Sequence, residues 1–176
     1  MKKEKKRKSD RTSGTVAEYG MMIALSFLFS YIETLIPIQL GLPGVKFGLA
    51  NLVNIVSLYL IGFKGTAAIS LVRILLVGLT FGNMFSMLYS LAGGALSLFF
   101  MIVCKKKKWF TPIGVSIIGG IAHNIGQLAI AAMVVENSAV FYYLPFLMAA
   151  GTAAGGCIGI LGGITVKRLS KYVKNR

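Results

Sequence analysis

The basic residues of this chain are gathered into a few clusters, with long apolar stretches between them. Seven of the 19 Lys and Arg residues lie within the first eleven positions, four form the run 105–108, and five lie from Lys167 onward. The apolar stretches are about 20 residues long, which is the length that a helix needs to cross the ~30 Å hydrocarbon core of a bilayer. The pattern therefore predicts an all-α integral membrane bundle.

The high positive charge does not indicate a nucleic-acid partner. A net charge of +14 is typical of nucleic-acid-binding domains, but those domains carry Lys and Arg on a soluble surface. Here 56% of the residues are hydrophobic, and basic clusters beside apolar spans are typical of cytoplasmic loops and tails. We therefore expect a lipid bilayer around the chain and no bound nucleic acid.

The chain divides into three parts with about six membrane-spanning helices. Residues 1–14 are expected to form a disordered basic cytoplasmic tail, 15–167 the transmembrane domain, and 168–176 a second basic cytoplasmic tail. A loop that contains Pro and Gly, over 37–44, separates the first two helices. The expected helices cover about 16–36, 45–61, 66–79, 84–103, 112–135 and 142–166.

An even number of crossings returns both termini to the same side of the membrane. With six helices, 17 of the 19 basic residues lie on that side, which makes it the cytoplasmic side of a cell membrane. Lys46 and Arg73 are the two exceptions. The second and third helices are short and bounded by glycine, which favours a re-entrant or closely packed pair. Merging them would give five helices and would put the basic tails on opposite sides.

Small residues recur at every fourth position in two of the expected helices. Gly151, Gly155, Gly159 and Gly163 form such a stripe in the last helix, and Gly20 and Ala24 have the same spacing in the first. Small residues let helix backbones approach closely in a membrane, where packing drives association. Two interpretations remain open, which are packing within this chain and docking of a separate membrane subunit.

A few polar residues interrupt the apolar helices. A charge near the bilayer centre costs at least ~2.5 kcal/mol, so such a residue usually faces a partner or a wet cavity. The expected topology places these residues in the middle and outer half of the membrane. One interpretation is an outward-opening pocket for a small polar or anionic ligand, and the other is a structural network in which Glu33 pairs with Arg73. The candidate ligand-binding residues are Glu33, Lys46, Asn51, Arg73, His123, Asn124 and Gln127, whereas Asn54 and Asn83 suit packing or capping.

The sequence offers little for catalysis or metal binding. Its one Asp lies at position 10, and it has no HExxH, P-loop or GxSxG motif. One His and two separated Cys do not make an ordinary zinc site. We expect no cofactor, no metal and no enzyme activity of its own.

Four segments resemble a known family of small membrane proteins. They are 43–51 (PGVKFGLAN), 90–94 (SLAGG), 114–116 (GVS) and 119–127 (GGIAHNIGQ). They are similar to the heptaprenyl diphosphate synthase component I family, also called the Gx transporter family, and the resemblance covers about residues 16–166. The family in turn is similar to the substrate-binding S components of energy-coupling factor transporters.

The resemblance implies two alternative functions. As an S component, the protein would have six helices, cytoplasmic termini, an outward ligand pocket and a lid formed by residues 37–44. It would bind a vitamin-, flavin- or isoprenoid-related ligand, and Gly20 and Ala24 would dock a transmembrane coupling subunit that works with ATPases. Alternatively, it would be a non-catalytic membrane subunit in heptaprenyl diphosphate and menaquinone synthesis or in flavin-linked electron transfer. In heptaprenyl diphosphate synthesis its partner would be a prenyl synthase, because the chain lacks the DDxxD motif of a self-sufficient synthase.

Overall fold

The computed structural model describes residues 2–35 and 48–173, and within them every regular element is a helix. The prediction of an all-helical membrane bundle is confirmed. The helices are α1 (Lys2–Leu35), α2 (Leu49–Leu60), α3 (Phe63–Thr80), α4 (Met84–Lys107), α5 (Pro112–Val135) and α6 (Leu144–Val173), with a short 3-10 helix η1 (Ser138–Tyr143) before α6.

Five stretches of helix are long and apolar enough to cross a membrane. They are residues Gly14–Leu35 of α1, the whole of α3, α4 and α5, and Ser138–Lys171, which joins η1 to α6. The remaining helix, α2, has 12 residues and is therefore about 18 Å long, too short to cross the bilayer alone. The second and third helices were both expected to be short. Only α2 is short, because α3 is long enough to cross a membrane.

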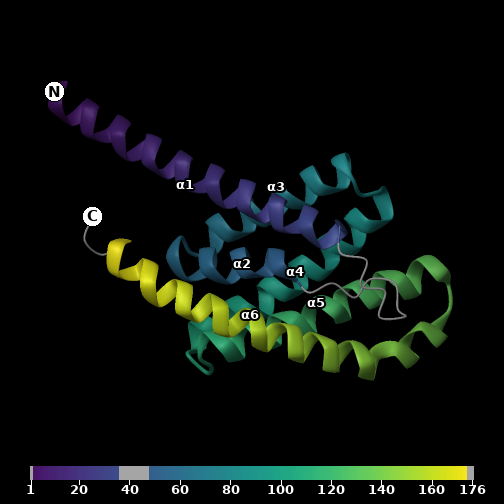
Figure 1. Ribbon diagram of the computed structural model, residues 1–176. Coiled ribbons are helices and arrows are strands. Elements are labelled where there is room, and N and C mark those ends of the chain that lie inside the picture. The colour runs from purple at the N-terminus through teal and green to yellow at the C-terminus, as the bar shows by residue number, and fades with distance from the viewer. Residues whose placement is uncertain (1, 36–47, 174–176) are drawn as a thin grey trace.

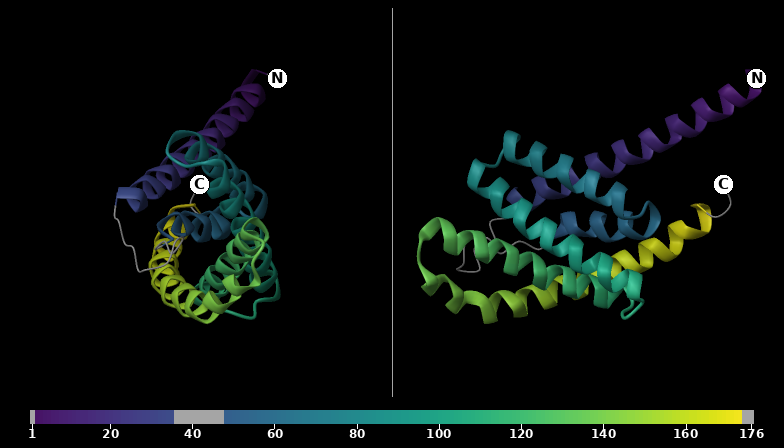
Figure 2. Two further views of the ribbon diagram at one scale, coloured as in Figure 1. Left: turned by 90° about the vertical axis from the view of Figure 1, so that its right-hand side faces the viewer. Right: turned by 180° about the vertical axis from the view of Figure 1, so that it is seen from behind.

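The short helix α2 lies in the core of the bundle. It packs against α1, α3 and α6, and Val53, Ile55 and Leu58 are almost completely buried. Consecutive helices form two halves, α1–α3 and α4–α6, which are visible in the end-on view of Figure 2. The halves meet where α2 packs on α6 and α3 packs on α4.

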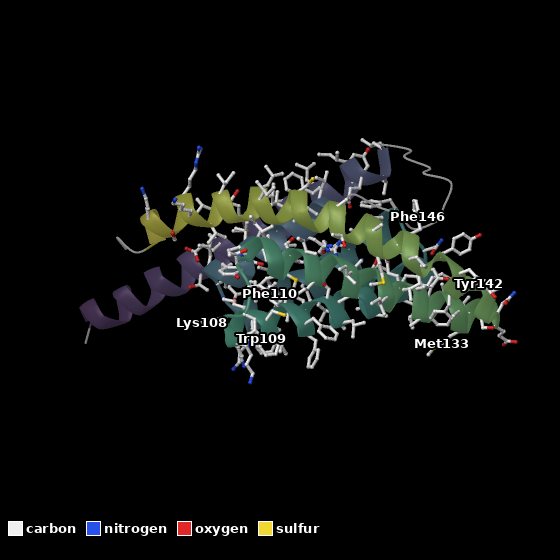
Figure 3. The ribbon with its side chains drawn as sticks, turned by 90° about the horizontal axis from the view of Figure 1, so that it is seen from below. Lys108, Trp109, Phe110, Met133, Tyr142 and Phe146 are labelled. Carbon is white, nitrogen blue, oxygen red and sulfur yellow. The ribbon has the colours of Figure 1, made fainter. Side chains whose placement is uncertain are left out.

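One end of the bundle carries the basic clusters, and we call it the basic end. The first turns of α1, the last turns of α6 and the turn between α4 and α5 all lie there (Figure 1). Figure 3 shows Lys108, Trp109 and Phe110 at this end and Met133 and Tyr142 at the opposite end. Aromatic residues at both ends are typical of the two membrane interfaces. Because α1 begins and α6 ends at the basic end, the arrangement fits an even number of passes.

The first helix extends through the segment that was expected to form the N-terminal basic tail. The structure begins α1 at Lys2, so the backbone of this segment is helical. Lys, Arg and Glu are good helix formers, and extending an existing helix avoids the cost of nucleation. The same effect carries α6 to Val173, beyond the expected boundary at residue 167.

Glycines fix the close contact between α5 and α6. A methyl group on Gly155 would lie 2.7 Å from Ile117 Cα, and one on Gly159 would lie 2.7 Å from Ile113 Cα. Both distances are too short for real side chains, so the two backbones touch. For this stripe, the interpretation of packing within the chain is confirmed.

Substitution of Gly155 by Ala tests this contact. We expect Gly155→Ala to lower the free energy of unfolding by about 1–3 kcal/mol, because the methyl group overpacks the α5–α6 interface. The matched control is Gly156→Ala, since Gly156 has no atom within 4 Å of the added methyl. Thermal unfolding in detergent measures both variants. Equal melting temperatures for the two would contradict the assigned contact.

Candidate functional site

A cavity lies between the two halves of the bundle, in the middle of the helices. Its volume is about 70 Å³, enough for several water-sized groups. Six of the seven candidate ligand-binding residues line it, although they come from positions as far apart as 33 and 127. The seventh candidate, Lys46, lies outside the described residues, as does the expected lid 37–44. The six that line the cavity are Glu33, Asn51, Arg73, His123, Asn124 and Gln127.

Two of these residues, His123 and Gln127, lie on one face of α5. His123 and Gln127 are one helical turn apart, so their side chains leave the helix on the same side. Gly93 of α4 faces them, and a methyl group there would lie 2.8 Å from the His123 carbonyl oxygen and 2.9 Å from Gln127 Cγ. The absence of a side chain at Gly93 therefore lets α4 lie directly against this part of the cavity wall.

Arg73 is the most deeply buried charged residue of the cavity. It lies on α3 with 8% of its surface exposed, and its Nη1 donates to Ser30 Oγ at 3.3 Å. Its Nε has no hydrogen-bond partner among the described residues. An unsatisfied buried donor on a charged group costs about 1–3 kcal/mol or more. The guanidinium therefore retains unused capacity to bind an acceptor.

Glu33 has a structural contact as well as a place in the cavity. Its Oε1 accepts a hydrogen bond from the backbone N–H of Leu49 at 2.5 Å, at the start of α2. Gly48, which precedes that helix, has a left-handed backbone with φ of 77°. A carboxylate at a helix N-terminus is stabilised by the helix dipole. Glu33 also attracts the Arg73 guanidinium by Coulombic interaction, so it partly balances the charge of the cavity.

The two asparagines use part of their hydrogen-bonding capacity within the protein. Asn124 Nδ2 donates to the carbonyl oxygen of Leu147 at 2.7 Å, which ties α5 to the first turn of α6. Asn51 Oδ1 accepts from Asn54 Nδ2 at 3.2 Å. Asn54 is buried, as expected of a packing residue. Asn83 is the N-cap of α4 and accepts from the Ser86 backbone N–H at 2.7 Å, which confirms its capping role.

Sequence reasoning missed the serines of the cavity. Ser97 and Ser116 carry its lining toward the basic end, where no polar cluster was expected. Serine interrupts the hydropathy of a membrane helix so little that it does not stand out. Their spacing could have identified them in the sequence. Ser116 precedes His123 by seven residues, and Ser90 precedes Ser97 by seven, which is two helical turns.

A known protein family matches most of this chain. The sequence model described as heptaprenyl diphosphate synthase component I matches residues 22–165, a range that contains every residue lining the cavity. The chain belongs to the heptaprenyl diphosphate synthase component I family. No curated protein and no solved structure matches it. In this family member, the cavity residues therefore lie within the part of the chain that defines the family.

The Glu33 contact predicts a graded effect of substitution. We expect Glu33→Ala to lower the free energy of unfolding by about 1 kcal/mol, because the N-terminus of α2 loses its acceptor. Glu33→Gln keeps a side-chain oxygen and should lose less. Chemical unfolding of both variants in detergent measures the difference. If the alanine variant is as stable as the wild type, the Leu49 hydrogen bond does not stabilise α2.

Proposed function

We propose that this member of the family binds a small anionic or polar ligand in the cavity and helps to move it across the cell membrane, as S components do. In this proposal the basic end is cytoplasmic and the ligand reaches the cavity from the opposite, outer side. The observation that carries the proposal is the buried Arg73 with its unpartnered Nε, beside His123 and Gln127.

The energetics of Arg73 support a ligand rather than a purely structural role. A guanidinium that served only to hold helices together would be stabilised best by satisfying all of its donors. A carboxylate or phosphate can accept two parallel hydrogen bonds from arginine, which makes Nε a suitable donor for such a group. The other polar side chains of the cavity, those of His123, Asn124 and Gln127, would then orient the ligand.

The surface of α1 supports a partner subunit in the membrane. Gly20 and Ala24 are exposed there, and a methyl group on Gly20 would have no atom within 4 Å. In contrast, Gly155 and Gly159 of α6 are buried against α5. We propose that Gly20 and Ala24 dock a transmembrane coupling subunit that works with ATPases.

The family description favours a second candidate function. A component of heptaprenyl diphosphate synthase would accompany a prenyl synthase, and this chain lacks the DDxxD motif that such a catalyst needs. In this alternative the protein is a non-catalytic membrane subunit for heptaprenyl diphosphate and menaquinone synthesis, or for flavin-linked electron transfer. The cavity would then bind a ligand without moving it.

Binding measurements test the role of the cavity. We expect the purified protein to bind riboflavin 5′-phosphate or geranyl diphosphate saturably. Arg73→Gln should weaken that binding at least tenfold and His123→Ala about fivefold, from the typical values of charged and neutral hydrogen bonds. Arg168→Gln is the matched control, because Arg168 is exposed on α6 outside the cavity. Unchanged affinity in both cavity variants would exclude the proposed site.

Affinity purification separates the two candidate functions. We expect the tagged protein, extracted from its native membrane, to bring down a transmembrane coupling subunit with ATPases. Gly20→Leu should abolish this association without lowering the melting temperature, because Gly20 is exposed and a methyl group added there would have no atom within 4 Å. Recovery of a prenyl synthase alone would instead support the accompanying-subunit alternative.

A further inference from the structure

A second cavity adjoins the central one at the end of the bundle opposite the basic end. It lies beside the turn between α3 and α4, which Figures 1 and 2 place at that end. Its volume is about 210 Å³, so it is larger than the central cavity and has room for several water molecules. Thr34, Gly82 and Asn83 belong to its lining and are exposed, so it reaches the surface of the bundle there. We call this second space the outer chamber.

The outer chamber and the central cavity meet at Val77 and Ser90. These two residues line both spaces, and both are half-buried. Val77 lies one helical turn after Arg73 on α3, and Arg73 is only 8% exposed. Burial therefore increases along the path, from the exposed Thr34 through the half-buried pair to the guanidinium. The two cavities form one route from the outer end of the bundle to Arg73.

A column of serines on α4 runs along this route. Ser90 follows Ser86 by four residues and precedes Ser97 by seven, so the three residues share one face of the helix. Ser86 lines the outer chamber, Ser97 lines the central cavity, and Ser90 lines both. Hydroxyl groups can donate to and accept from a polar solute or the water around it. The column therefore suits a solute that enters from water.

The route separates passage from recognition of charge. Among the described residues that line the outer chamber, none is charged. The charged side chains, Arg73 and Glu33, belong to the lining of the central cavity. A solute would therefore pass the outer chamber without binding an ion there, and it would meet the guanidinium only beyond Val77 and Ser90. Passage then depends on the width between these two side chains.

We propose that the outer chamber is the entrance through which a water-soluble anion reaches Arg73, and that Val77 and Ser90 form the constriction that controls its passage. This inference rests on the proposed function and adds the route to the site. The route lies between the end of α1 and the turn from α3 to α4. A wider side chain at Val77 would slow the arrival of a solute, and a smaller one would speed it.

Alkylation of an introduced cysteine tests the route without knowledge of the natural ligand. The probe is iodoacetate, a small carboxylate that is ionised at about pH 8. The full chain is used in lipid nanodiscs, with Cys104→Ala and Cys157→Ala to remove both native thiols. Ser97→Cys reports arrival in the central cavity, and Thr34→Cys reports arrival in the outer chamber. Mass spectrometry of the intact protein measures the rate at each position.

Substitutions at Val77 should change one rate and not the other. We expect Val77→Trp to slow alkylation of Ser97→Cys on the order of tenfold and to leave Thr34→Cys within about twofold, because the constriction lies between the two positions. Leu76→Trp is the matched control and should change neither rate, since Leu76 is 39% exposed and lines neither cavity. If Val77→Trp does not fold, Val77→Ala serves instead, and it should speed alkylation of Ser97→Cys several-fold.

The outcomes separate this inference from the proposed function. If the rate at Ser97→Cys is the same in both Val77 variants, or if that cysteine does not react while Thr34→Cys does, the solute does not arrive through the outer chamber. Equal slowing at both positions also overturns the inference, because Val77→Trp then does not act at the constriction. In each of these cases the anion site at Arg73 can still stand. If Arg73→Gln leaves ligand affinity unchanged while Val77→Trp slows alkylation as expected, the entrance stands and the anion site fails.

Discussion

Burial of one positive charge in an apolar helix bundle is the constraint on which the rest of this structure depends. Arg73 lies in a helix that crosses the membrane, and its Nη1 bonds to Ser30 of a neighbouring helix. Taking a guanidinium out of water is costly unless it is paired or faces a polar space. The structure meets that cost with a hydroxyl, the nearby negative charge of Glu33 and a central cavity. The remaining donor, Nε, makes the site suitable for an anion.

Glycine contacts hold the backbones of α4, α5 and α6 close together. Gly93 brings α4 against His123, and Gly155 and Gly159 bring α6 against the backbone of α5. Through these contacts α5 packs against both α4 and α6. The short helix α2 completes the site from the other half, because its start, held by Glu33, places Asn51 beside the cavity. The polar residues that line the cavity are therefore held close together by the packing of the helix backbones that carry them.

Much of this site could be predicted from the sequence, for a simple physical reason. Charged and amide side chains are rare in membrane helices, so Arg73, His123 and Gln127 stood out and were expected to meet. Serines are not rare there, so Ser30 and Ser97 were missed. The contact between Glu33 and Leu49 could not be predicted from the sequence, because it depends on how α1 packs against α2 in three dimensions.

The central claim is that Arg73 donates to a bound anion, and nitrogen NMR of that side chain tests it most directly. With ¹⁵N-labelled arginine, the Nε–H signal of Arg73 is identified by its loss in Arg73→Gln. Titration with geranyl diphosphate should shift this signal saturably, while the signal of the exposed Arg168 stays in place. A saturable shift that parallels the measured affinity is the predicted result. An Arg73 signal that does not move while the probe binds would contradict the account.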